Sequence, residues 1–62
     1  MKEHRMYQVE DIRSIMNIGR DKAYALFKSR GFPSIKIGRN YYILEEDFLA
    51  WLNKYKGGEY QL

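Results

Sequence analysis

Four side chains between residues 20 and 28 fall at spacings that place them on one face of a helix. Arg20 can form a bidentate contact with a guanine edge, while Tyr24 and Lys28 can bond or pair with phosphates. Asp21 has two alternative roles. It can accept a hydrogen bond from a cytosine amino group, or it can interact favourably with the helix dipole and hold Arg20 or Lys22 in place. This face therefore suits contact with a nucleic acid. The alternative for Lys22 and Lys28 is a solvated helix face.

A second set of polar residues follows in "PSIKIGRNYYI", Pro33–Ile43, where apolar and polar residues alternate with the period of a strand. We expect a two-stranded hairpin that turns at Gly38-Arg39-Asn40. Arginine is favoured in a narrow minor groove, so Arg39 at the tip suits DNA. The alternative is a hairpin that only covers the core. The alternation predicts an inner face of Ile35, Ile37, Tyr41 and Ile43, an outward Lys36 and Tyr42, and a tip of Arg39 and Asn40.

Positive charge is concentrated in the middle of the chain. The formal net charge is +3, yet residues 20–42 carry six basic side chains against Asp21 alone, which is +5. Residues 45–47 are all acidic, which contributes −3. Such a concentration of one sign attracts a polyanion.

The elements that must position these residues follow from hydrophobic periodicity. Apolar residues at three- and four-residue spacing predict helices over 8–16, 20–29 and 45–55. A three-residue link containing Gly19 joins the first two helices, as in a helix-turn-helix. The fold class we predict is mainly α with a small β-hairpin, a winged helix-turn-helix. We expect residues 6–56 to form the domain, with flexible tails at 1–5 and 57–62.

Several function classes are disfavoured by composition. The chain has no cysteine and one histidine, His4, in a polar N-terminal stretch, so we expect no metal, no cofactor and no catalytic site. No apolar run approaches the length of a membrane span, and no signal peptide opens the chain. We expect neither an enzyme, nor a membrane partner, nor a small-molecule substrate. The absence of cysteine fits a reducing cytoplasm.

Residues 7–52 resemble the excisionase-type, MerR-like winged helix-turn-helix domains of phages, conjugative transposons and small bacterial regulators. The resemblance is carried by "IGRDKAYALFK" and most specifically by "FPSIKIGRNYYILEEDFLAWL". Two positions differ: family members commonly carry serine where Gly19 stands and a basic residue where Tyr42 stands. The resemblance implies DNA contacts from Arg20, Asp21, Lys22, Tyr24, Lys28, Lys36, Arg39, Asn40 and Tyr42.

The resemblance also implies a role. Excisionases act without catalysis: they bind repeated sites near the end of a mobile element, bend the DNA and help an integrase to assemble. Other members are small transcriptional regulators. The implied partners are double-stranded DNA, an integrase or recombinase, and further copies of the chain on DNA, in a bacterial cytoplasm at the nucleoid. The alternative is a protein-interaction module that docks on an integrase or another acidic partner through Tyr24, Tyr42 and Tyr60, all expected to be exposed.

Overall fold

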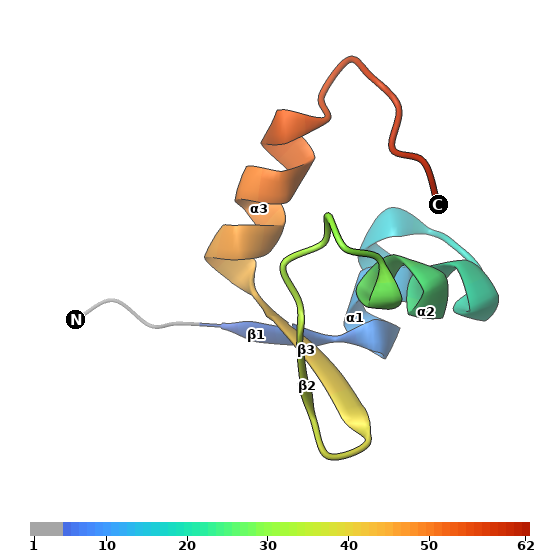
Figure 1. Ribbon diagram of the computed structural model, residues 1–62, viewed down its shortest axis with the longest axis vertical. Coiled ribbons are helices and arrows are strands. Elements are labelled where there is room, and N and C mark those ends of the chain that lie inside the picture. The colour runs from blue at the N-terminus through green and yellow to red at the C-terminus, as the bar shows by residue number, and fades with distance from the viewer. Residues whose placement is uncertain (1–4) are drawn as a thin grey trace.

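The structure is a computed structural model that describes residues 5–62 of the chain (Figure 1). The predicted tail over 1–5, with His4, therefore lies outside the described residues except for Arg5. The predicted order of helix, turn, helix, hairpin and helix is confirmed, and one further strand precedes it. The elements are β1 (Met6–Gln8), α1 (Val9–Met16), α2 (Arg20–Lys28), β2 (Ile35–Ile37), β3 (Asn40–Leu44) and α3 (Glu45–Lys54).

The link between α1 and α2 is three residues long, as expected. Asn17 ends α1 in the left-handed conformation, with φ 55° and ψ 50°, which asparagine tolerates better than most residues. Ile18 follows and packs against the core. Gly19 then begins α2 without a side-chain hydrogen bond to the helix N-terminus. On α1, Val9 and Ile12 are buried, whereas Ile15, which the periodicity assigned to the apolar face, is 52% exposed.

The hairpin of β2 and β3, here called the wing, has a different register from the one expected. Ile37 pairs with Asn40, so the loop holds only two residues, Gly38 and Arg39. Gly38 has a φ of +63°, and glycine at the first position is typical of a type II′ turn. A loop shorter by one residue moves every side chain of β2 to the opposite face.

The predicted inner face of the wing was therefore wrong for β2. Ile35 lies opposite Tyr42, and Lys36 lies opposite Tyr41, so each pair shares a face. Ile35 and Ile37 are 54% and 60% exposed, whereas Ile43 on the inner face of β3 is fully buried. Lys36 and Tyr42, expected on the same side, lie on opposite faces of the sheet.

The additional strand β1 completes a three-stranded antiparallel sheet of order β1-β3-β2. Tyr7 of β1 pairs with Ile43 of β3. Its hydroxyl donates a 2.7 Å hydrogen bond to the Glu45 carboxylate at the start of α3. Beside it, the Asp11 carboxylate accepts a bond from the backbone N–H of Gln8, which fixes the entry to α1. β1 thereby ties the first helix to the last.

The core is largely aromatic and lies between the three helices and the inner face of the sheet. Trp51 of α3 is only 6% exposed, and its ring meets Phe32 at a centroid distance of 4.9 Å. T-shaped contacts link Phe32 to Phe27 and to Phe48. Aromatic pairs of this geometry contribute about 0.5–1.5 kcal/mol each beyond burial, which helps a chain of this length to stay folded. The buried apolar residues are Val9, Ile12, Ala23, Leu26, Phe27, Phe32, Ile43, Phe48 and Trp51.

Residues after α3 turn back onto the body of the protein (Figure 1). The Tyr60 ring meets Trp51 at 5.0 Å and Tyr55 at 4.8 Å. Its hydroxyl lies 2.6 Å from that of Ser29, which donates its own proton to the Leu26 carbonyl, so Tyr60 is the donor. Tyr60 was expected to be exposed, as were Tyr24 and Tyr42, and all three are half-buried. The flexibility of residues 57–62 stays a prediction.

Candidate nucleic-acid interface

Helix α2 presents its polar residues to solvent, because its apolar residues recur at the spacing of the opposite face. Ala23, Leu26 and Phe27 are buried, and Phe27 is 2% exposed. The four charged side chains proposed for DNA contact are exposed, while Tyr24 between them is half-buried. The exposed set is Arg20, Asp21, Lys22 and Lys28.

A row of alternating cationic and aromatic contacts runs from α2 to the wing. The Arg20 guanidinium lies 5.6 Å from the centroid of the Tyr24 ring. Tyr24 meets Tyr41 of β3 edge to face, with centroids 6.3 Å apart. The Lys36 ammonium lies 5.6 Å from the centroid of the Tyr41 ring. These four residues, the cation–aromatic row, hold one positive charge on the helix and one on the wing at a fixed separation.

Beside this row lies a cavity of about 200 Å³ between α2, the wing and the start of α1. Tyr24 and Tyr41 form its aromatic wall, and Arg39 and Asn40 bring polar groups from the wing. Glu10 also lines it, but its carboxylate is held by Arg13 at 3.1 Å. The predicted helix face and the predicted wing tip are thus brought to the same side of the molecule.

The position of the wing is fixed by the end of α2. The Ser34 hydroxyl, just before β2, donates a 2.7 Å hydrogen bond to the Phe27 carbonyl. The last carbonyls of a helix have no partner within it, so this bond satisfies one of them. The Ser29 hydroxyl satisfies another, at Leu26. Helix and wing therefore share hydrogen bonds as well as ring contacts.

Two predicted contact residues have strand positions on the sheet face opposite Tyr41: Asn40, which still lines the cavity beside the turn, and Tyr42. The partner of Tyr42 across the sheet is Ile35, on the face turned away from α2 and from Tyr41. The contact of Tyr42 with DNA stays a prediction. Tyr41, by contrast, was assigned only to the core, and it is the residue that joins the two halves of the site. The alternation already placed Tyr41 on the inner face, and its pairing with Lys36 follows once the loop is counted as two residues.

The basic residues of this interface are available to an external partner. Within residues 5–62 the salt bridge is the one between Arg13 and Glu10, and the cations of α2 and the wing form none with a described carboxylate. Lys36 and Arg39 are exposed. A positive electrostatic potential on an exposed helix and hairpin favours association with phosphates.

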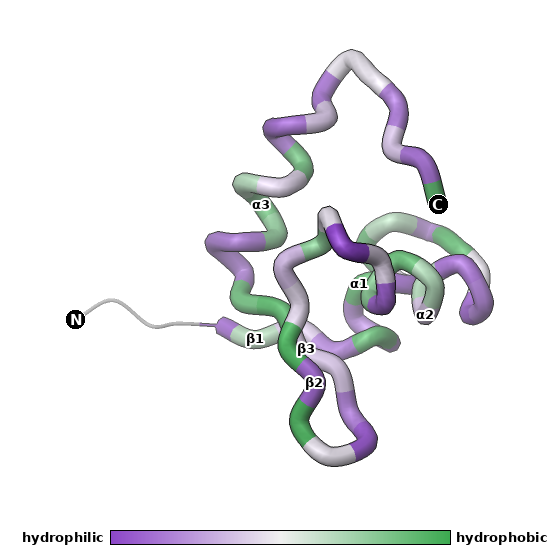
Figure 2. The backbone as a smooth tube through the Cα atoms, in the orientation of Figure 1, coloured by the Kyte–Doolittle hydropathy of each residue, from purple (hydrophilic) through white to green (hydrophobic). Residues whose placement is uncertain are grey.

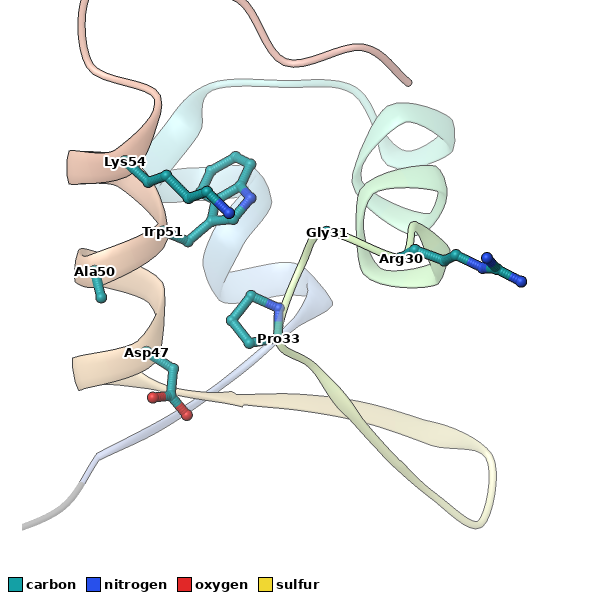
Figure 3. Close-up of a pocket in the computed structure, with 7 residues that line it drawn as sticks. All are labelled: Arg30, Gly31, Pro33, Asp47, Ala50, Trp51 and Lys54. Carbon is teal, nitrogen blue, oxygen red and sulfur yellow. The ribbon is translucent and has the colours of Figure 1, made fainter.

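A separate cavity of about 320 Å³ lies between α3 and the loop before β2 (Figure 3). Trp51 and Pro33 form its apolar part, and Lys54 also lines it, with its ammonium 5.6 Å from the centroid of the Tyr55 ring. The Arg30 side chain points away from it (Figure 3). Asp47 lies on its lower rim (Figure 3).

Two other findings bear on the class of site. Residues 5–62 contain no group of three or more His, Cys, Asp or Glu side chains that could hold a metal ion. None of the helices in this described part is long and apolar enough to cross a bilayer.

An exposed recognition helix, a tight turn before it and a hairpin beside it define a DNA-binding protein of the winged helix-turn-helix class. The sequence model of the helix-turn-helix domain family matches residues 6–56 of this chain. The chain belongs to that family, which binds double-stranded DNA. No match was found among curated proteins or among solved structures.

Proposed function

We propose that this chain recognises a specific DNA sequence and acts as an excisionase-like recombination directionality factor or a small transcriptional regulator of a mobile element. α2 enters the major groove, and the wing lies on the adjacent minor groove and backbone. The protein acts without catalysis, on DNA of the bacterial nucleoid. An integrase would be its partner in the excision role.

The observation that supports this proposal is the cation–aromatic row. It fixes Arg20 at the start of α2 and Lys36 on the wing, on the same side as Arg39 and Asn40. A helix in the major groove needs its N-terminal residues at base edges and a second group of cations on flanking phosphates. Arg20, Asp21 and Lys22 in the first turn of α2 supply the first set. The cations Lys28, Lys36 and Arg39 supply the second, and Tyr24 and Asn40 add polar contacts.

The test is a titration of the protein against labelled DNA from the region flanking its own gene, at several salt concentrations and with random DNA as competitor. About six phosphate contacts give a slope of log affinity against log salt near −5. Lys36→Ala should flatten that slope by about one unit and weaken binding to all sequences alike. Lys56→Ala, in the turn after α3, is the matched control and should leave the slope unchanged.

A slope near zero, or binding that random DNA removes completely, contradicts the proposal. The location of the bound sites then distinguishes the two roles. Repeated sites at the end of an element support an excisionase, whereas a site over a promoter supports a regulator.

A further inference from the structure

One face of the sheet carries no charged side chain. The register places seven residues on the face opposite Ile43, and all are apolar, aromatic or amides. The chain has 31% charged residues, and the solvent-facing side of an antiparallel sheet ordinarily carries polar and charged side chains. We call this set the outer sheet face: Met6, Gln8, Ile35, Ile37, Asn40, Tyr42 and Leu44.

The described part of the chain leaves most of this face exposed, although Tyr42 and Leu44 are half-buried. The helices pack on the other side of the sheet, through Tyr7 against Phe48 and Tyr41 against Tyr24. Met6, Ile35 and Ile37 are 43%, 54% and 60% exposed. Figure 2 shows hydrophobic positions along β2, on a hairpin that projects from the body. The exposed apolar side chains on this face are therefore available for contact with a partner.

We propose that the outer sheet face binds the same face of a second copy of this chain when both copies are on DNA; this rests on the proposed function. We propose a second copy as the partner because of the charge distribution. Residues 20–42 carry a net +5, so two copies repel each other through their DNA-binding sides. The uncharged outer sheet face is a surface on which a like-charged copy can approach, and two apolar faces complement each other under two-fold symmetry.

The small area explains why DNA is required. Strands of three to five residues cover on the order of 200 Å² in a three-stranded sheet, at about 3.3 Å per residue and about 4.8 Å between strands. A stable complex buries about 800 Å² on each partner. The pair therefore does not persist in solution, but neighbouring sites on one DNA molecule raise the effective concentration enough for contact.

Two-fold packing of the outer sheet faces also fixes the arrangement of the DNA sites. Each wing then lies between its own α2 and the wing of the neighbour. The order along the DNA is helix, wing, wing, helix, which requires an inverted repeat with the wings toward its centre. A direct repeat does not bring two outer sheet faces together.

The experiment begins with selection of a single site from random DNA, which tests the proposed function on its own. Three sets of probes then carry two such sites as a wing-inward inverted repeat, a wing-outward inverted repeat or a direct repeat, with the spacing varied. We expect the second copy to bind the wing-inward probe about tenfold or more tightly at one spacing, with no gain on the others.

Ile35→Ser and Ile37→Ser should each remove this cooperativity and leave single-site affinity unchanged. Ile15→Ser, at 52% exposure on α1, is the matched control and should retain it. Circular dichroism checks that all three variants fold. Equal affinities on every arrangement overturn the inference, as does cooperativity that survives both wing variants or is lost equally in Ile15→Ser. Failure to select any single site contradicts the proposed function instead, and this inference with it.

Discussion

The Tyr24 ring on α2 meets the Tyr41 ring on the wing edge to face, with planes at 79° and centroids 6.3 Å apart. Tyr41 also contacts Phe27, with centroids 6.1 Å apart, and lies under the Lys36 ammonium. Together with the hydrogen bond from Ser34 to the Phe27 carbonyl, the Tyr41 ring thus sets the relative position of α2 and the wing.

We expect Tyr41→Leu to lower the free energy of unfolding by about 1–3 kcal/mol. The change keeps an apolar side chain but removes two aromatic pairs and a cation–π contact, each contributing about 0.5–1.5 kcal/mol. Tyr41→Phe keeps all three and should remain within about 0.5 kcal/mol of the original protein, since surface hydroxyls contribute little. Urea unfolding measures both. Equal stability of the Leu and Phe variants would mean that the ring contacts do not hold the wing.

Arg20→Ala should relax sequence specificity. A bidentate arginine contact with guanine discriminates by about 1–3 kcal/mol against the wrong base. In competition between the selected site and its single-base variants, Arg20→Ala should therefore lose this preference at one base position. Lys56→Ala removes one positive charge from the turn after α3 and should preserve the preference. Unchanged discrimination in Arg20→Ala would place base readout elsewhere on α2.

Gly19→Ser should stabilise the protein by about 0.5–1 kcal/mol. Serine can accept a bond from a free N–H at the start of α2, and it restricts the unfolded chain. Gly19 has a φ of −71°, and a Cβ there meets no atom within 4 Å. Thermal unfolding should show a rise of about 4–8 °C for each kcal/mol in a domain of this size.

The control for this change is Gly31→Ala, which adds a Cβ where there is no room. It would lie 2.8 Å from the Tyr60 hydroxyl, so Tyr60 must shift from its place against Ser29. We expect a lower midpoint in this variant. A lower midpoint in Gly19→Ser as well would show that α2 begins differently.

Tyr7 gives a prediction about alkaline pH. Its hydrogen bond to the Glu45 carboxylate, helped by burial and by the charge of that carboxylate, raises the pKa of the Tyr7 hydroxyl above its ordinary value of 10.0. The protonated hydroxyl is favoured in the folded state. Its contribution to stability is therefore present below pH 10 and is lost as pH rises through the higher folded value.

The measurement is urea unfolding of the original protein and Tyr7→Phe from neutral to alkaline pH. The stability advantage of the original protein should shrink above pH 10, and ultraviolet titration should show the loss of one late-ionising tyrosine in Tyr7→Phe. A difference that is constant across this range would show that the hydrogen bond does not couple ionisation to folding.

Helix periodicity was enough to predict most of this fold. Ala23, Leu26 and Phe27 recur at helical spacing and are buried, and α2 ends at Lys28, one residue before its predicted end. The exposed polar face of α2 followed from the same pattern, because a helix that buries one side must expose the other.

The wing shows where sequence patterns fail. Alternation predicted the strands, but Gly-Arg-Asn fits a three-residue turn as well as Gly-Arg fits a two-residue one. The difference of one residue decides whether Ile35 or Lys36 shares a face with Tyr41. β1 was missed for another reason. Three residues carry little signal of their own, and this strand forms because β3 offers it a partner far along the chain.

The burial of Trp51 has a practical consequence. It is the single tryptophan of the chain, it is ringed by Phe32, Tyr55 and Tyr60, and it lies on α3 rather than on α2 or the wing. Its fluorescence therefore reports the packing of the core and the closure of the C-terminal segment. Emission should change on unfolding and stay constant on DNA binding, so a single sample can show that a variant with weakened binding is still folded.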